Sequence, residues 1–109
     1  MKISDLQSGQ GSINMELTIK SIEEPRAFNK YGKYLRVAKA LVSDGESQIK
    51  LTLWNQDIEK VKEGMIIRII NGYVSEFQGE KQLTTGKFGK IEVVSEENKT
   101  QEEIEKKEV

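Results

Sequence analysis

Hydrophobic and polar residues alternate along three segments in the first half of the chain, residues 13–22, 34–42 and 49–54. A period of two is typical of strands that have one face in a core and the other face toward solvent. Asp44-Gly45 lies between the second and third segments and is a favoured hairpin turn. We therefore predict three strands, the last two joined as a hairpin. The apolar positions that share a face within each segment are Met15, Leu17 and Ile19; Leu35, Val37 and Leu41; and Ile49, Leu51 and Leu53.

The second half of the chain predicts a short helix and two further strands. Residues 55–62 have helical spacing of apolar positions, and residues 65–74 are apolar enough on both sides to form a central strand. Asn71-Gly72 near the end of that strand indicates a bulge that redirects the residues after it. Residues 82–94 are predicted as a last, bent strand.

The predicted order is three strands, a short helix and two strands. An all-β, five-stranded OB-fold Greek-key barrel with a short helix between strands 3 and 4 has this order. In such barrels the ligand face comprises strands 2 and 3, with the loops that join strands 1 to 2 and 4 to 5. We therefore expect the binding residues on that face.

Length, charge and missing residue types narrow the function. The 109 residues suffice for one domain, and the absence of Cys and His excludes disulfides and the commonest metal and nucleophilic sites. The net charge is −1, but residues 95–109 hold six acids and three lysines, so residues 1–94 carry about +2. We expect residues 1–94 to be the folded domain and residues 95–109 to be a disordered acidic tail. No apolar run approaches the roughly 18 residues that span a bilayer, so we expect no membrane association.

Three aromatic residues are candidates for stacking on nucleic-acid bases. Trp54 shares a face of its strand with Lys50 and Thr52, opposite the apolar positions, so it is expected to point outward. Tyr73 and Phe77 flank the expected bulge and could align along one groove. The alternatives are that Trp54 packs under the helix and that Tyr73 or Phe77 belongs to the core.

Residues 26–33 are expected to form a turn-rich loop after Pro25, with cations and aromatics interleaved. Cations there could neutralise phosphates, although a charged loop can also be simply solvated. The candidate residues of this loop and of the ligand face are Arg26, Phe28, Lys30, Tyr31, Lys33, Arg36, Lys50 and Thr52.

Residues 42–54, 61–64 and 71–79 together resemble the archaeal single-stranded DNA-binding proteins and the replication protein A family, and the resemblance covers about residues 3–94. It implies a non-enzymatic, cofactor-free OB-fold protein that binds single-stranded DNA in replication, recombination or repair. It also implies base stacking on Trp54, Tyr73 and Phe77, contacts from the first loop, and a cytoplasmic, nucleoid-associated protein. The acidic tail is by analogy a candidate docking segment for replication or repair proteins.

Two other binding functions fit the same fold, because a fold does not fix its ligand. One is a protein-interaction OB domain of a replication complex, and the other is an RNA-binding OB domain. Catalysis is disfavoured, since the acidic residues are isolated in turns or flanks without an acid/base companion.

Overall fold

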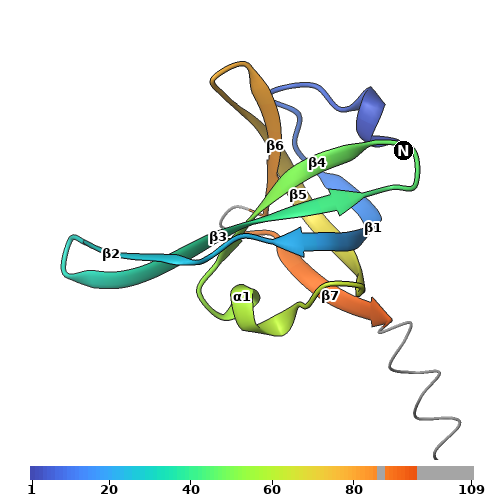
Figure 1. The fold of residues 1–109 in the computed structure, drawn as a ribbon. Coiled ribbons are helices and arrows are strands. Elements are labelled where there is room, and N and C mark those ends of the chain that lie inside the picture. The colour runs from blue at the N-terminus through green and yellow to red at the C-terminus, as the bar shows by residue number, and fades with distance from the viewer. Residues whose placement is uncertain (86–87, 96–109) are drawn as a thin grey trace, which may run out of the picture.

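The computed structural model describes residues 1–85 and 88–95 of the 109-residue chain. Apart from Ser95, the predicted acidic tail lies outside the described residues. A single helical turn and eight further elements follow one another along the chain (Figure 1). They are η1 (Ile3–Asp5), β1 (Ile13–Ile22), β2 (Arg26–Lys30), β3 (Lys33–Ser43), β4 (Gln48–Trp54), α1 (Gln56–Lys60), β5 (Ile66–Phe77), β6 (Glu80–Thr84) and β7 (Lys90–Ser95). None of the helices among the described residues has the length and apolar character needed to cross a membrane.

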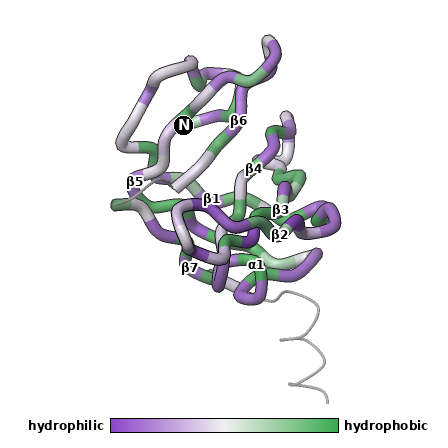
Figure 2. The backbone as a smooth tube through the Cα atoms, turned by 90° about the vertical axis from the view of Figure 1, so that its left-hand side faces the viewer, coloured by the Kyte–Doolittle hydropathy of each residue, from purple (hydrophilic) through white to green (hydrophobic). Residues whose placement is uncertain are grey.

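Five strands close into a ring in the order β1, β3, β4, β6, β5 and back to β1. The β4–β6 pair is parallel and the other pairs of the ring are antiparallel. Hydrophobic and hydrophilic positions follow one another along the strands (Figure 2), and the buried ones fill the inside of the ring. The fully buried large side chains are Leu6, Ile13, Leu17, Ile19, Val42, Leu51, Leu53, Ile67, Ile69, Val74, Leu83 and Ile91.

The predicted all-β OB-fold barrel is confirmed, with two differences in its elements. Residues 26–33 were expected to be a loop, but they form β2 and the turn into β3, so the helix lies between β4 and β5. The predicted last strand, residues 82–94, is divided into β6, which closes the ring, and β7, which pairs with β5.

The β2–β3 hairpin, residues 26–37, projects from the barrel as an arm (Figure 1). Its two-residue turn has Tyr31 at φ 53° and Gly32 at φ 77°. Two consecutive left-handed residues give a turn whose twist matches that of the flanking strands. The first of these positions usually holds Asn, Asp or Gly, and because Tyr31 is none of these, the sequence gives only a weak hairpin signal here.

The face of β3 that enters the core is opposite to the one that carries Leu35, Val37 and Leu41. Ala38, Ala40 and Val42 are buried there, and Ala38 and Ala40 pair with Leu53 and Leu51 of β4. Small alanines opposite large leucines fill the narrow interior without overpacking. The larger apolar residues of β3 are consequently left on the outer face of the barrel.

The bulge predicted at Asn71-Gly72 is present in β5. Ile13 pairs with Gly72 and Met15 with Ile69, so three steps of β5 oppose two steps of β1. Asn71 has a left-handed φ of 54°, which Asn tolerates better than most residues, and its N–H donates to Asn14 Oδ1 over 3.1 Å. A Cβ on Gly72 would lie 2.6 Å from Ile69 Cγ2, so the position requires glycine.

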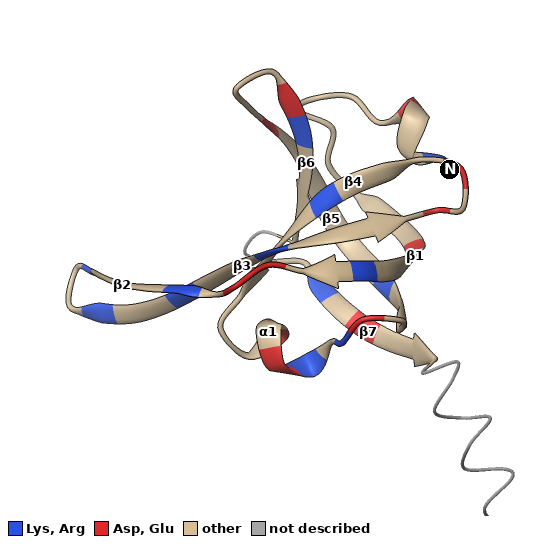
Figure 3. Cartoon of the chain, in the orientation of Figure 1, with Lys and Arg blue, Asp and Glu red and all other residues tan. Residues whose placement is uncertain are grey.

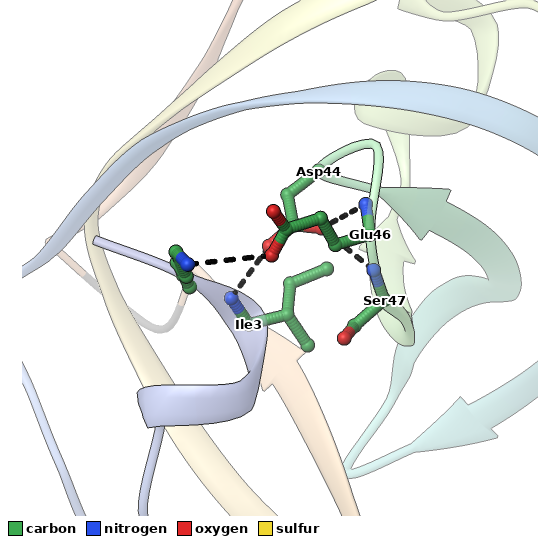
Figure 4. Close-up of polar contacts among 5 residues, drawn as sticks. Ile3, Asp44, Glu46 and Ser47 are labelled. Carbon is green, nitrogen blue, oxygen red and sulfur yellow. Dashed lines mark hydrogen bonds and ion pairs between the residues drawn. The ribbon is translucent and has the colours of Figure 1, made fainter.

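Asp44 ties the N-terminal turn to the β3–β4 connection (Figure 4). Its Oδ1 accepts hydrogen bonds of 2.8 Å from the N–H groups of Glu46 and Ser47, and its Oδ2 accepts one of 2.8 Å from Ile3 N–H. These hydrogen bonds, that from Ser47 foremost, lower the pKa of Asp44 from 3.8 to about 2. Because they favour the ionised carboxylate, folding is more favourable when Asp44 is charged.

Acid should therefore weaken the fold through Asp44. Its contribution is complete above pH 3.8 and is lost as the pH falls toward about 2, since the unfolded chain takes up the proton first. Asp44→Asn keeps an oxygen for the turn but loses the acceptor of Ile3, so the variant should melt at a lower temperature at pH 7 and show a flatter pH dependence between 4 and 2. Thermal melting of both proteins across this range checks this, and parallel curves would contradict it.

Candidate nucleic-acid interface

Trp54 ends β4 on the outer face of the barrel, as its alternation predicts. Its side chain is 38% exposed, and its ring meets Phe28 of the arm edge to face, with ring centroids 6.4 Å apart and planes at 72°. Asn55 follows with φ 52° and continues the pairing with β3, because its Oδ1 accepts from Arg36 N–H and its N–H donates to Arg36 O, both over 3.0 Å. This clamp fixes where β4 ends and hence where Trp54 points.

Tyr73 and Phe77 lie on the same outer face, on the part of β5 that follows the bulge. Their side chains are 44% and 62% exposed, respectively. Tyr73 pairs with Thr84 of β6, and Phe77 pairs with Glu80 at the tip of the β5–β6 hairpin. Neither residue belongs to the core, so the alternative of a core role is not what the structure shows.

A groove of about 350 Å³ separates the base of the arm from the β5–β6 hairpin. Its volume is at the lower end of the roughly 300–1,000 Å³ of pockets that bind small ligands. Three cations and three carboxylates line it, so its formal charges balance. The lining residues are Glu23, Glu24, Arg26, Val37, Ala38, Lys39, Lys50, Phe77, Gln78, Glu80 and Gln82.

Lys39 of β3 lies at the floor of the groove, and the sequence analysis did not single it out. Its Nζ donates to Thr52 Oγ1 over 2.8 Å and to Gln82 Oε1 over 2.6 Å. Burial and the neighbouring ammonium of Lys50 lower the pKa of Lys39, while Glu23 and Glu80 act in the opposite direction. Alternation places Lys39 with Val37 on the outer face, but only the register of β3, β4 and β6 reveals its two partners.

Thr52 is on the predicted face but is only 8% exposed, and its hydroxyl is occupied by Lys39. Lys50 is half-buried, lines the groove and pairs with Glu23, with 3.4 Å between Nζ and Oε2. Neither residue therefore presents a free group to a ligand, because the Thr52 hydroxyl accepts from Lys39 and the Lys50 ammonium pairs with Glu23.

Several Lys and Arg residues lie along the arm (Figure 3). Arg26, Lys30 and Lys33 are exposed, and none of them pairs with a carboxylate within the described part of the chain. Lys30 Nζ lies 5.7 Å from the ring centroid of Tyr31, which is itself exposed at the tip of the arm. The arm thus presents positive charge together with aromatic rings.

Arg36 is the one predicted residue that the structure does not bring to this face. It alternates with Leu35 and Val37, and its guanidinium Nη1 lies 2.8 Å from Glu59 Oε1 of α1.

No group of three or more acidic residues that could hold a metal ion occurs within residues 1–85 and 88–95.

Sequence similarity relates the chain to a known family. A family model described as single-stranded DNA binding protein Ssb-like, OB fold, matches residues 12–93. The single-stranded DNA binding protein Ssb of Saccharolobus solfataricus is 29% identical over 96 residues, which are 88% of this chain and 65% of that protein. The chain therefore spans slightly less than two thirds of that relative's length.

Two solved structures show the same fold. The replication factor A related protein from Methanobacterium thermoautotrophicum has a TM-score of 0.73 and 23% identity, with 87% of this chain and 90% of that chain covered. A chain of a replication protein A heterotrimer bound to single-stranded DNA has a TM-score of 0.68 and 18% identity, with 87% of this chain and 24% of that chain covered.

Substitution of Trp54 should leave the barrel folded. Trp54→Ala removes an edge-to-face contact and a partly exposed ring, so we expect a loss of about 1 kcal/mol in the free energy of unfolding. Leu53→Ala, at the fully buried neighbour, should cost about 2–5 kcal/mol. Urea unfolding of both variants measures the difference, and equal losses would mean that Trp54 is a core residue.

Proposed function

This chain belongs to the Ssb-like family of single-stranded DNA-binding proteins with an OB fold, and on that premise we propose that it binds single-stranded DNA by stacking bases on Trp54, Tyr73 and Phe77. The observation that carries the proposal is the exposure of these three rings on one face of the barrel. Large apolar rings left in water forgo burial, which a stacked base would restore.

Stacking explains a preference for single strands over duplexes. Every base has a π face, so stacking on an aromatic side chain contributes about 1–3 kcal/mol per base with little regard to sequence. In a duplex these faces are already stacked on their neighbours and are not available to the protein. Three rings would then hold a few nucleotides of an unpaired strand.

The phosphates are proposed to follow the arm rather than the groove. Arg26, Lys30 and Lys33 are exposed and have no carboxylate partner in the described segments, whereas the cations of the groove are offset by Glu23, Glu24 and Glu80. Phe28 and Tyr31 add apolar surface along the same path. Neutralising phosphates releases counterions, so binding should weaken with salt.

The proposed role is binding without catalysis, at single strands exposed during replication, recombination or repair in the nucleoid. The acidic tail is proposed to dock replication or repair proteins. Competition between DNA and RNA would show whether RNA is the preferred ligand. Absence of binding to single strands would indicate that a protein partner contacts the face that carries Trp54, Tyr73 and Phe77.

Each of Trp54→Ala, Tyr73→Ala and Phe77→Ala should weaken binding to an oligothymidine about 5- to 150-fold, which corresponds to about 1–3 kcal/mol for one lost stacking contact. Tyr34→Ala is the matched control, because Tyr34 is exposed on the arm but alternates with Leu35 toward the opposite face. Fluorescence anisotropy of a labelled oligonucleotide measures the dissociation constants. The stacking proposal fails if the three variants bind as tightly as Tyr34→Ala.

Substitutions of Arg26 and Arg36 distinguish a phosphate contact from a structural ion pair. Arg26→Ala should weaken binding and reduce the slope of log K against log salt by about 0.7, the value for one phosphate contact on a single strand. Arg36→Ala should leave this slope unchanged, because Arg36 pairs with Glu59 on the other face. Titrations at three or more salt concentrations give both slopes, and a reduced slope in Arg36→Ala alone would contradict the proposed path of the strand.

A further inference from the structure

Gln82 of β6 lies between the positions of two stacking residues. It pairs with Ser75 of β5, while Tyr73 and Phe77 lie two residues to either side of Ser75 on the same face. Gln82 is 7% exposed and lines the groove. A base that enters between these two rings would bring an edge toward this amide.

Lys39 fixes which end of the Gln82 amide faces the groove. A lysine ammonium can only donate, so the Gln82 oxygen must be the atom that lies 2.6 Å from Lys39 Nζ. Thr52 Oγ1, 2.8 Å from the same Nζ, holds Lys39 from the neighbouring strand. The amide NH₂ group of Gln82 is then directed away from Lys39.

That NH₂ group has no hydrogen-bond partner within residues 1–85 and 88–95. Among these residues, every fully buried side-chain nitrogen or oxygen has a hydrogen-bond partner, so this nitrogen, which has none, is not fully buried. It therefore reaches solvent in the groove with both of its hydrogens available. A nearly buried amide held in one orientation loses little conformational entropy when a ligand binds it.

The charge of the groove favours the edge of a base over a phosphate. Arg26, Lys39 and Lys50 are balanced there by Glu23, Glu24 and Glu80, and Lys39 and Lys50 already have partners. A neutral heterocycle with a carbonyl oxygen meets a donor at Gln82 without bringing charge into this balance. An exocyclic amino group at the same place would bring its own N–H donors against those of the Gln82 amide, so no hydrogen bond could form.

We propose that Gln82, positioned by Lys39, donates a hydrogen bond to the C4 carbonyl oxygen of uracil or thymine, so that in a bound single strand the domain prefers these bases to cytosine, which carries an amino group at C4. This inference rests on the proposed function, because it assumes that bases stack on Tyr73 and Phe77. Gln82 is the specificity-determining residue and Lys39 is a positioning residue. The aromatic rings themselves would not distinguish these pyrimidines.

Oligodeoxyuridine and oligodeoxycytidine of equal length are the probes, because their rings have the same size and share the C2 carbonyl. They differ at C4, which carries a carbonyl oxygen in uracil and an amino group in cytosine, and at the adjacent N3, which carries a hydrogen only in uracil. The wild-type protein should bind the uracil strand about fivefold more tightly, as expected for one discriminating hydrogen bond. In Gln82→Glu the carboxylate still accepts from Lys39 but presents an acceptor to the groove. Its preference should fall below that of the wild type and move toward cytosine.

Two further variants test the role of each residue. Gln82→Met has a similar length and no hydrogen-bonding group, and it should bind both strands equally. Lys39→Met leaves Gln82 in place but lets its amide turn, so the preference should also disappear. Thermal melting verifies that each variant is folded, and a loss of stability without a change in the uracil-to-cytosine ratio would mean that the network is only structural.

The outcomes separate this inference from the proposed function. Tight binding of both strands by the wild type, with a ratio near one or a ratio that Gln82→Glu leaves unchanged, overturns the role of Gln82 and leaves stacking intact. Binding of neither strand overturns the proposed function itself. A wild-type preference for uracil that shifts toward cytosine in Gln82→Glu supports the inference.

Discussion

The aromatic face depends on a change of side-chain alternation halfway along β5. Ile67 and Ile69 point into the barrel, and in a regular strand Tyr73 and Phe77, at an even spacing from them, would point inward as well. The extra residue at Asn71 shifts the alternation, so Gly72 and Val74 become buried and Tyr73 and Phe77 turn outward. The left-handed Asn71 and the glycine next to it thus place both rings on the outer face of the barrel.

The same face combines exposed rings with a polar floor that is almost fully satisfied. Lys39 links three strands by donating from β3 to Thr52 of β4 and Gln82 of β6. Satisfied networks of this kind fix side-chain geometry, whereas the exposed aromatics above them contribute little to folding. The stability of the domain comes from the apolar interior of the ring, so residues of the outer face can serve ligand binding at little cost to folding.

Alternation along the chain predicted the strands at 13–22, 34–42 and 49–54 and the outward direction of Trp54, and Asn71-Gly72 predicted the bulge, because these features depend on residues close in sequence. It did not predict that residues 26–33 form an arm, since Tyr31 is an unusual residue for the turn, nor that the last strand divides in two. Arg36 is expected on the ligand face as long as the larger apolar residues of β3 are taken to face the core. In the fold the alanines of β3, paired with Leu51 and Leu53, take the inner positions, and this pairing cannot be read from β3 alone. Lys39 and Gln82 are 43 residues apart, and only the folded register brings them together.

The measurement closest to the central claim uses the single tryptophan as its own reporter. Trp54 fluorescence would be followed during titration with a short oligothymidine at two salt concentrations, beside a duplex of the same length. Stacking of bases on Trp54 predicts strong quenching by the single strand, weaker apparent binding at the higher salt concentration, and little change with the duplex. Unchanged fluorescence with the single strand would contradict the account and favour a protein partner for the aromatic face.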